Sequence, residues 1–365
     1  MITERDVFYL KYALRLAKKG GAKTMPNPNV GVVIVKDDVI VGHGYHKRYG
    51  FYHAEVYAIK MAGMKAKGAT CYVTLEPCSH YGKTPPCAIA LVNAGISRLI
   101  YISGDPNPKV SGCGIKILED AKITVEKCNE LESVDHKLNE AWRYFIVSKM
   151  PFVTLKMATG LDGKIATVDG ESKWITGEGA RNDVQRLRGQ TAAILTTADT
   201  LIADNAKLTY RLKGSGVQPL RIVLDADLRT DPDADIYNHP IGLGRTLLCT
   251  KKSNDISKYS NKNVDFYFDD DNGEHINMVK LFKYLGEISI TSILIESGGV
   301  FAAAMLKEKL VNRICWYTAP IILGGEKSRS SVLGAGYGDI SSAPRLKDIE
   351  IKRLGDDIKI TGIVV

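Results

Sequence analysis

Four residues in the first quarter of the chain have the types and the spacing of a catalytic metal site: His53, Glu55, Cys78 and Cys87. One imidazole and two thiolates supply three ligands for Zn²⁺ and leave the fourth tetrahedral position open for water, which distinguishes a catalytic zinc from a structural one. Zinc lowers the pKa of its water from about 16 towards 7 and so provides a nucleophile at neutral pH. The four residues therefore predict hydrolytic chemistry at one zinc ion per chain.

Glu55 is expected to stay off the metal and to act as the general acid and base. It would take the proton of the water and return it to a departing nitrogen. A histidine and a glutamate followed by Pro77-Cys78 and a second cysteine is a pattern typical of zinc-dependent base deaminases. Eight residues, 79–86, separate the two cysteines here, where that pattern usually has two.

Other interpretations of these residues stay open at this point. Cysteines in a reduced protein are often small buried hydrophobic residues without a metal. His80 could also be a fourth ligand, which would make the zinc structural. We favour a loop or substrate role for His80, because a fourth protein ligand would close the open position and a structural zinc would not need Glu55.

Alternating strands and helices are predicted to position the ligands. Helices are expected to begin near His53 and after Pro85-Pro86, and their N-termini would favour thiolates and a bound anion. Thr3 and Asp6 form a variant of the capping box for a first helix that ends at Gly20-Gly21. Short β-rich runs predict strands at residues 30–35, 39–44, 69–74 and 98–103. This order is typical of a three-layer α/β/α domain.

The second half alternates in the same way. Residues 131–150 have the apolar periodicity of one helix, which Pro151 ends, so we expect two domains, at residues 1–147 and 148–365. Further strands are predicted at 152–157, 193–196, 221–224, 246–249 and 293–295, a helix at 275–285, and a hairpin at 346–352 and 357–364. Two domains also suit 365 residues, which is more than one ordinary core supports.

Composition and charge limit the partners and the compartment. The net charge is +8, but the basic residues are spread along the chain without a basic arm or an aromatic-basic stripe, so we expect a small phosphorylated substrate and no nucleic acid. No apolar run is long enough for a membrane span, and no apolar signal core follows the charged start. Seven scattered cysteines suit a reducing compartment. We therefore expect a cytoplasmic protein without a membrane contact.

Several motifs carry a resemblance to a known family. Asn27-Pro-Asn-Val-Gly31, His53-Ala-Glu-Val56, the run from Glu76 to Cys87 and Gly112-Cys-Gly114 resemble the bacterial bifunctional deaminase/reductase family of riboflavin biosynthesis. In that family the longer gap between the cysteines is the rule. The resemblance implies that residues 80–86 line a pyrimidine pocket, with substrate contacts from Asn27, His46 and Lys83. The alternative for each of these three is a hydrogen bond within a loop.

The second half has only a weak signal of its own. No G-x-G-x-x-G follows a strand, but the apolar run ending in Glu296-Ser-Gly-Gly299 leads into a predicted helix and would let backbone amides approach a phosphate. The resemblance extends here and implies a domain similar in fold to dihydrofolate reductase that uses NADPH. By match, the cofactor contacts are Ala158, Trp174, Thr200, Asp204, Gly298 and Gly299. The substrate contacts are Lys156, Ser172, Arg188, Leu208, Arg211 and Glu296.

The residue types agree with this match. Lys156, Arg188 and Arg211 are cations of the kind that a ribose phosphate requires. Two positions depart from the family pattern, because Ala206 stands where proline is usual and Ala226 where serine often follows Leu-Asp. Neither change removes a charge, so we expect an effect on affinity rather than on activity.

The leading hypothesis is a two-step enzyme of riboflavin synthesis. Its first half would hydrolyse the 2-amino group of 2,5-diamino-6-ribosylamino-4(3H)-pyrimidinone 5′-phosphate, and its second would reduce the ribosyl group of the resulting aminouracil with NADPH. Domains of this kind commonly associate, so a homo-oligomer is expected. One alternative is a nucleoside or nucleic-acid deaminase with an unrelated C-terminal module, against which the long gap and the reductase motifs argue. The other is a non-catalytic zinc protein with four protein ligands.

Overall fold

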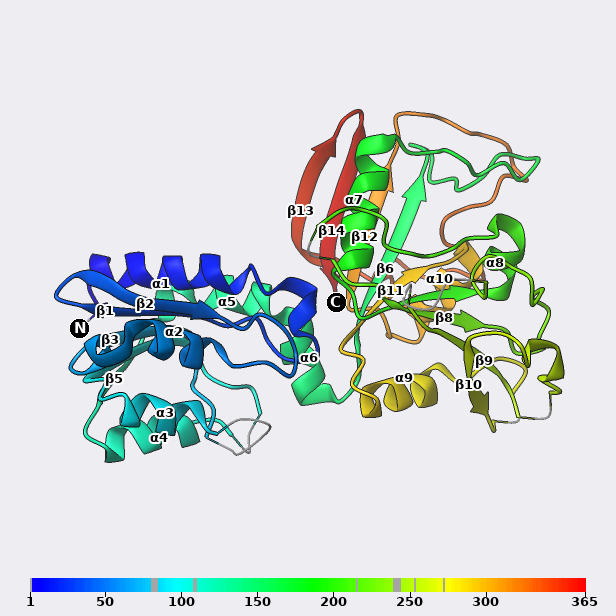
Figure 1. Ribbon diagram of the computed structural model, residues 1–365. Helices are drawn as coiled ribbons and strands as arrows, with labels where there is room; N and C mark the ends of the chain where they lie inside the picture. The colour runs from blue at the N-terminus through cyan, green and yellow to red at the C-terminus, as the bar shows by residue number, and fades with distance from the viewer. Residues whose placement is uncertain are drawn as a thin grey trace. The chain divides into compact units, whose positions relative to one another are not determined.

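The computed structural model describes residues 2–79, 85–107, 110–214, 216–238, 244–252, 254–271 and 273–365. It divides into two compact units, Met1–Lys149 and Met150–Val365, which are described one at a time (Figure 1). Within the described residues, no helix has the length and apolar character needed to cross a membrane.

The described part of the first unit is built on a five-stranded sheet in the order β2-β1-β3-β4-β5. The predicted hairpin is present, since β1 pairs with β2 and β3 in antiparallel orientation, while β3, β4 and β5 are parallel. Its strands are β1 (Gly31–Lys36), β2 (Val39–Tyr45), β3 (Thr70–Leu75), β4 (Arg98–Ser103) and β5 (Thr124–Lys127).

Helices cover both faces of this sheet, so the predicted three layers are confirmed (Figure 1). One face packs against α1 (Glu4–Ala17) and α5 (Glu132–Leu138), and the other against α2 (Ala54–Ala62), α3 (Cys87–Asn93) and α4 (Cys113–Asp120). The capping box at the start of α1 is also confirmed. Gly44 fixes α2 on the sheet, because a Cβ there would lie 2.4 Å from the Ala54 carbonyl oxygen. That contact places the residue before α2, His53, at the end of the sheet.

The prediction of one helix over residues 131–150 is wrong. Helix α5 ends before Asn139, where φ is −110° and ψ is 19°, and a separate helix α6 (Glu140–Ser148) follows. Asparagine side chains compete for backbone groups outside their own helix, and Asn139 binds the backbone of Asn29. Val134, on the predicted apolar face, is exposed.

The second unit contains a nine-stranded sheet in the order β10-β9-β8-β7-β11-β6-β12-β14-β13 among its described residues. All strands from β10 to β12 in that order are parallel, and β14 and β13 form the predicted antiparallel hairpin. The strands are β6 (Phe152–Thr159), β7 (Ala193–Thr197), β8 (Leu220–Leu224), β9 (Thr246–Lys251), β10 (Val264–Asp269), β11 (Ser292–Glu296), β12 (Arg313–Thr318), β13 (Leu346–Leu354) and β14 (Asp357–Val364).

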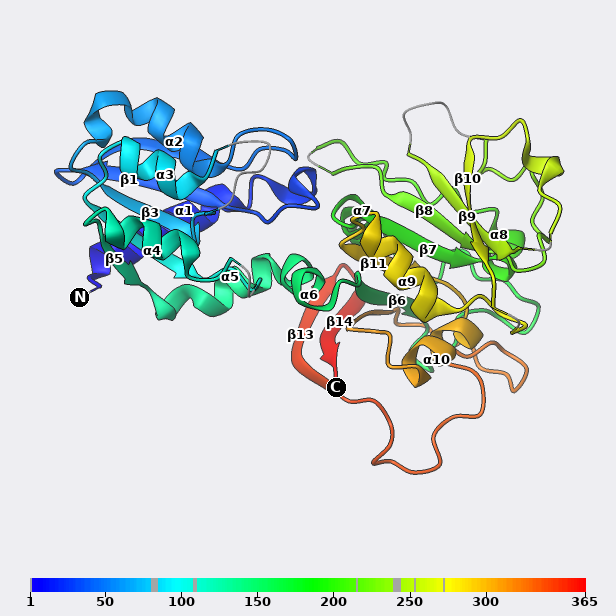
Figure 2. The same cartoon turned by 90° about the horizontal axis from the view of Figure 1, so that it is seen from below.

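Helices also cover both faces of this sheet, which confirms the predicted α/β class. On one face α9 (Met278–Glu287) and α10 (Gly299–Lys307) bury Phe282 and Met305 against the central strands; Figure 2 shows these two helices on the near side of the sheet. The other face packs against α7 (Glu178–Gly189) and α8 (Ala198–Asp204). The predicted helix at 275–285 is present as α9, preceded by its N-cap residue Asn277.

Candidate active sites

Three side chains of the first unit meet with the geometry of a zinc site. His53 is the N-cap residue of α2, Cys87 is the first residue of α3, and Cys78 follows β3. Their ligand atoms all lie within 4.8 Å of one another, with His53 Nδ1 at 3.6 Å from Cys78 Sγ and at 3.3 Å from Cys87 Sγ. A tetrahedral zinc with Zn–N and Zn–S bonds of about 2.1 and 2.3 Å separates N from S by about 3.6 Å. The residues therefore fit a zinc ion.

The surroundings of the sulfurs favour thiolate ligands. Hydrogen bonding from the Cys87 thiol lowers the pKa of Cys78 to about 4. The backbone N–H of Cys87, at the N-terminus of α3, also donates to Cys78 Sγ at 3.3 Å, as predicted for a helix start that faces the ligands. Cys87 keeps the proton that the pair shares, and its own pKa is raised. A divalent cation would replace that proton.

Glu55 lies beside the ligands without joining them. Its side chain belongs to the first turn of α2 and is 4% exposed. Burial raises the pKa of the Glu55 carboxyl above its ordinary value, and the nearby Cys78 thiolate adds to that rise. Among the described residues the cluster has no fourth ligand, and His80 lies outside those residues. A buried carboxyl of raised pKa beside three ligand atoms has the chemistry of a general acid and base.

Asn27 and His46, two predicted substrate contacts, bind each other beside His53. His46 Nδ1 lies 3.1 Å from the Tyr52 carbonyl oxygen, and His46 Nε2 lies 3.2 Å from Asn27 Nδ2. Because the carbonyl can only accept, Nδ1 carries the hydrogen and Nε2 accepts from the Asn27 amide. Burial lowers the pKa of His46, and its ring packs edge-on against that of His53, with the centroids 5.5 Å apart. The third predicted contact, Lys83, lies outside the described residues.

Glu76 and Gly114 support the segment that carries Cys78. The buried Glu76 carboxylate accepts from the backbone N–H groups of Asp105 and Gly114, both at 3.3 Å. A Cβ on Gly114 would lie 1.8 Å from the Pro77 carbonyl oxygen, so only glycine fits there. No role of their own is predicted for these residues from the sequence. The position of Glu76 directly before Pro77-Cys78 was the available signal.

The second unit has a cavity of about 2030 Å³ beyond the carboxyl ends of β6, β7, β8 and β11. Ligands of open parallel sheets bind at this edge, and the volume exceeds the ~300–1,000 Å³ of a single small-molecule site. All of the contacts predicted for this half line the cavity. They are Lys156, Ala158, Ser172, Trp174, Arg188, Thr200, Asp204, Leu208, Arg211, Glu296, Gly298 and Gly299.

Glu296, the last residue of β11, is the centre of a largely buried charge cluster in this cavity. Arg188 holds its carboxylate at two points, with Nε–Oε1 and Nη2–Oε2 distances of 2.7 and 2.9 Å. Lys156 Nζ lies 3.8 Å from Oε2. Burial alone would raise the pKa of Glu296, but the two cations lower it to about 2. Arg188 is therefore committed to Glu296, while the Arg211 guanidinium donates to the Thr209 hydroxyl at 3.4 Å.

Three of the predicted cofactor contacts, Thr200, Gly298 and Gly299, meet at the start of α10. The Gly298 N–H donates to Thr200 Oγ1 at 3.2 Å, which joins the β11–α10 turn to α8. A Cβ on Gly299 would lie 2.4 Å from the Ser330 carbonyl oxygen. Trp174 is 72% exposed at the rim, with the Arg181 guanidinium carbon 4.8 Å from its ring centre. The Gly298 N–H is thus already bound by Thr200, and the close approach of the Ser330 backbone leaves room only for glycine at position 299.

Arg229, which the sequence analysis did not select, also lines this cavity. It follows β8, and Asp225 Oδ1 accepts its backbone N–H at 2.8 Å. The Arg229 guanidinium lies 2.8 Å from Asp199 Oδ1, and both side chains are at least half exposed. The departure at Ala226 lies in the same segment and also lines the cavity. No sequence motif marks Arg229, and its ion-pair partner Asp199 lies 30 residues earlier, on α8.

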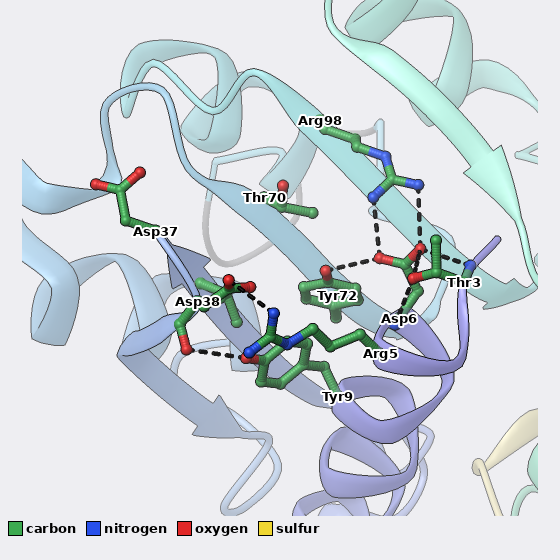
Figure 3. Close-up of a pocket in the computed structure, with 10 residues that line it drawn as sticks. Thr3, Arg5, Asp6, Tyr9, Asp37, Asp38, Thr70, Tyr72 and Arg98 are labelled. Carbon is green, nitrogen blue, oxygen red and sulfur yellow. Dashed lines mark hydrogen bonds and ion pairs between the residues drawn. The ribbon is translucent and has the colours of Figure 1, made fainter. Parts of the chain in front are cut away.

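A smaller hollow of about 320 Å³ in the first unit is occupied by its own polar groups (Figure 3). Asp6 accepts hydrogen bonds from Thr3, from the Tyr72 hydroxyl and from both terminal nitrogens of Arg98. These bonds tie the start of α1 to β3 and β4. The hollow is therefore a structural feature of the fold.

Two family models match the chain, one in each unit. The model of the cytidine and deoxycytidylate deaminase zinc-binding region matches residues 3–103. The model of the RibD C-terminal domain matches residues 151–360.

The chain is also similar over its whole length to individual proteins. The riboflavin biosynthesis proteins RibD of Bacillus amyloliquefaciens and Escherichia coli (strain K12) are 41% and 40% identical to it, over 98% and 97% of this chain and 96% and 98% of theirs. The solved structure of Acinetobacter baumannii RibD (form 1) superposes with a TM-score of 0.90 at 37% identity. A diaminohydroxyphosphoribosylaminopyrimidine deaminase/5-amino-6-(5-phosphoribosylamino)uracil reductase from Thermotoga maritima superposes at 0.87 and 32%. Both superpositions cover 99% of each chain.

Proposed function

The chain belongs to the RibD family of riboflavin-biosynthesis proteins, and from this membership we infer how its two sites divide the work. It is an enzyme with deaminase and reductase activities in riboflavin biosynthesis. We assign the deaminase to residues 1–147 and the reductase to residues 148–365. The proposed substrates are 2,5-diamino-6-ribosylamino-4(3H)-pyrimidinone 5′-phosphate and the aminouracil that its deamination produces.

The observation that carries the deaminase proposal is the arrangement of three ligand atoms around one point with a buried carboxyl beside them. Bound zinc supplies the Lewis acidity that activates water. Glu55 takes a proton from the attacking water and delivers it to the leaving amino nitrogen, so that water replaces the amino group and ammonia leaves. Because Asn27 donates its amide hydrogens towards His46, its Oδ1 is available to accept from the pyrimidine.

The reductase proposal depends on the charge cluster around Glu296. NADPH, when bound, supplies a hydride. Reduction at ribose C1′ breaks its bond to the ring oxygen, which must then receive a proton. We assign this proton to Lys156, because burial lowers the pKa of its ammonium group and Glu296 holds it in place at 3.8 Å. Arg211, which has no carboxylate partner among the described residues, would bind the substrate phosphate.

Arg229 supports NADPH as the cofactor rather than NADH. NADH carries no 2′-phosphate, so a preference for NADPH requires a cation at the place where the 2′-phosphate lies. Arg229 is a cation at the cavity rim whose backbone is fixed by Asp225 and whose partner, Asp199, is exposed. A 2′-phosphate would replace Asp199 as the partner of the guanidinium.

Location and assembly complete the proposal. All seven cysteines are free, and the zinc ligands require reduced sulfur, which supports a cytoplasmic enzyme. We also propose a homo-oligomer. The edge strand β13 supports it, because Ile349 and Ile351 are 55% and 71% exposed on the last strand of the described sheet.

The proposed function is tested by incubating the purified protein with the diaminopyrimidinone phosphate, with and without NADPH, and identifying the products by mass. Without NADPH, we expect ammonia and the aminouracil phosphate. With NADPH, we expect the ribityl product. The proposal fails for the first site if no ammonia is released, and for the second if the aminouracil accumulates in the presence of NADPH.

A further inference from the structure

The interruption between α5 and α6 places a buried amide against the segment that carries Asn27. Asn139 Oδ1 accepts from the Asn29 N–H at 2.8 Å, and Asn139 Nδ2 donates to the Asn29 carbonyl oxygen at 3.1 Å. One side chain thus satisfies both backbone groups of a residue 110 positions away. Asn139 is 3% exposed, so water does not compete for these bonds.

Asp135, one turn earlier in α5, uses the remaining hydrogen of that amide. Asn139 Nδ2 donates to Asp135 Oδ1 at 3.2 Å, and Asp135 is 0% exposed. An ionised carboxylate only accepts, so the amide must turn its nitrogen towards Asp135. Its oxygen then faces the Asn29 N–H, which is the orientation that the backbone of Asn29 needs.

The same connection continues into the deaminase site. Asn29 follows Asn27 by two residues, and Asn27 donates to His46 Nε2 at 3.2 Å. His46 lies against the ring of the metal ligand His53. A displacement of Asn29 would therefore move the amide that faces the substrate.

Packing alone gives no reason for this pair. A buried carboxylate is costly, and Asp135 Oδ2 has no hydrogen-bond partner in the part of the chain that the structure describes. An uninterrupted helix would also keep the apolar periodicity of residues 131–150. The structure instead keeps a polar pair in which the Asn139 amide binds Asp135 and both backbone groups of Asn29.

We propose that Asn139, oriented by Asp135, is a positioning residue of the deaminase site that sets the place of Asn27 and the orientation of His46. This inference rests on the proposed function, in which Asn27 contacts the pyrimidine. Asn139 and Asp135 touch neither substrate nor metal. Their effect is on substrate binding and on the approach of the pyrimidine to Glu55.

The test compares Asn139→Asp with Ser133→Asp in the full-length enzyme. Both substitutions add one negative charge near α5, but Ser133 is exposed. Asp at 139 cannot donate to Asn29 or to Asp135, so we expect kcat/KM for deamination to fall at least tenfold, mainly through KM, as misplacement of a binding group does. Zinc content and NADPH-dependent reduction of preformed aminouracil should be unchanged. Ser133→Asp should leave all three quantities unchanged.

A double-mutant cycle with Asn27→Ala separates the possible failures. If Asn139 acts through Asn27, kcat/KM for deamination in the double variant should be within about twofold of the value for Asn27→Ala alone. If Asn27→Ala leaves deamination unchanged, the assignment of Asn27 in the proposed function is wrong. If Asn27→Ala impairs deamination but Asn139→Asp does not, only the present inference is overturned.

A second variant decides the matter if Asn139→Asp does not fold. Asp135→Asn removes the buried charge and keeps the volume, but an amide can present either a donor or an acceptor to Asn139. We expect a severalfold rise in the KM for deamination in a protein that is folded and reduces the aminouracil normally. An unchanged KM in this variant would overturn the inference.

Discussion

Arg188 and Glu296 form a two-point ion pair inside the reductase cavity, with nitrogen–oxygen distances of 2.7 and 2.9 Å. The pair joins α7 to the end of β11, two elements that are more than 100 residues apart in the sequence. Since Lys156 also faces Glu296, one carboxylate balances two buried cations. Glu296 is therefore the counter-charge that Arg188 and Lys156 share.

Replacing Glu296 by glutamine should disable the reductase and spare the deaminase. The substitution leaves the charges of Arg188 and Lys156 buried without a counter-charge, so their placement against the substrate is lost. We expect kcat/KM for NADPH-dependent reduction to fall on the order of 100-fold. The exposed Glu287→Gln in the same unit makes the same charge change and should be neutral. Equal loss of ammonia release would contradict two separate sites.

Replacing Asp135 by asparagine should stabilise the first unit in a pH-dependent way. Burial raises the pKa of Asp135 to about 6, against the opposing effects of the Arg143 charge and the Asn139 hydrogen bond. Because the folded pKa is above the ordinary value of 3.8, the proton favours folding at low pH, and this contribution is lost as pH rises from about 4 through 6. At pH 8 the ionised Asp135 therefore lowers the free energy of unfolding of the wild type by about 3 kcal/mol. The variant has no charge at this position and does not incur this loss.

Hydrogen exchange of α1 peptides in the full chain measures this effect. The difference in opening free energy between the Asp135→Asn variant and the wild type should be small near pH 4 and grow up to pH 7. A difference that is constant over this range would contradict the buried, proton-binding state of Asp135.

Gly114→Ala should lower zinc content without a change in any ligand. The added methyl would lie 1.8 Å from the Pro77 carbonyl oxygen, so the segment that carries Cys78 must move. We expect at least a tenfold weaker zinc affinity, measured by competition with a chelator and elemental analysis. Gly104→Ala is the matched control, since its nearest atom is Glu76 Oε2 at 3.7 Å. Full zinc occupancy in Gly114→Ala would show that this contact does not position Cys78.

Arg229→Met should reduce the preference for NADPH over NADH. If Arg229 binds the 2′-phosphate, its loss raises the KM for NADPH at least tenfold and leaves the KM for NADH nearly unchanged. The control, Arg245→Met, breaks a similarly exposed pair with Asp265 that does not line the cavity. A parallel rise of both KM values would place Arg229 elsewhere on the cofactor.

The metal site could be predicted from the sequence because its residues lie close together in the chain and their types and order are typical of a zinc site. His53 and Cys87 begin helices, and helix starts are visible in the sequence as prolines and breaks in periodicity. The α/β class and the strands around the sites followed from alternating apolar runs. The break at Asn139 could not be predicted, since the apolar periodicity continues on both sides of it and its partner, Asn29, is 110 residues away.

The reductase site shows the same limit. Arg188 was expected at a phosphate because its type suits one, but its partner is Glu296, and only the pairing of β11 with its neighbours brings them together. Arg229 gave no signal, because its importance comes from the contact with Asp199 on α8. Sequence patterns thus identify the residue types of a site, while the pairing of its charges depends on long-range contacts.

The most direct test of the central claim is a paired measurement on Glu55→Gln, in which zinc content and ammonia release are determined on the same sample. Glutamine cannot carry the proton from water to the leaving nitrogen, but it does not alter His53, Cys78 or Cys87. We predict one zinc ion per chain, normal reduction of preformed aminouracil, and ammonia release lowered by about 10²–10⁴-fold. Ammonia release at the wild-type rate from a zinc-loaded Glu55→Gln enzyme would contradict the account.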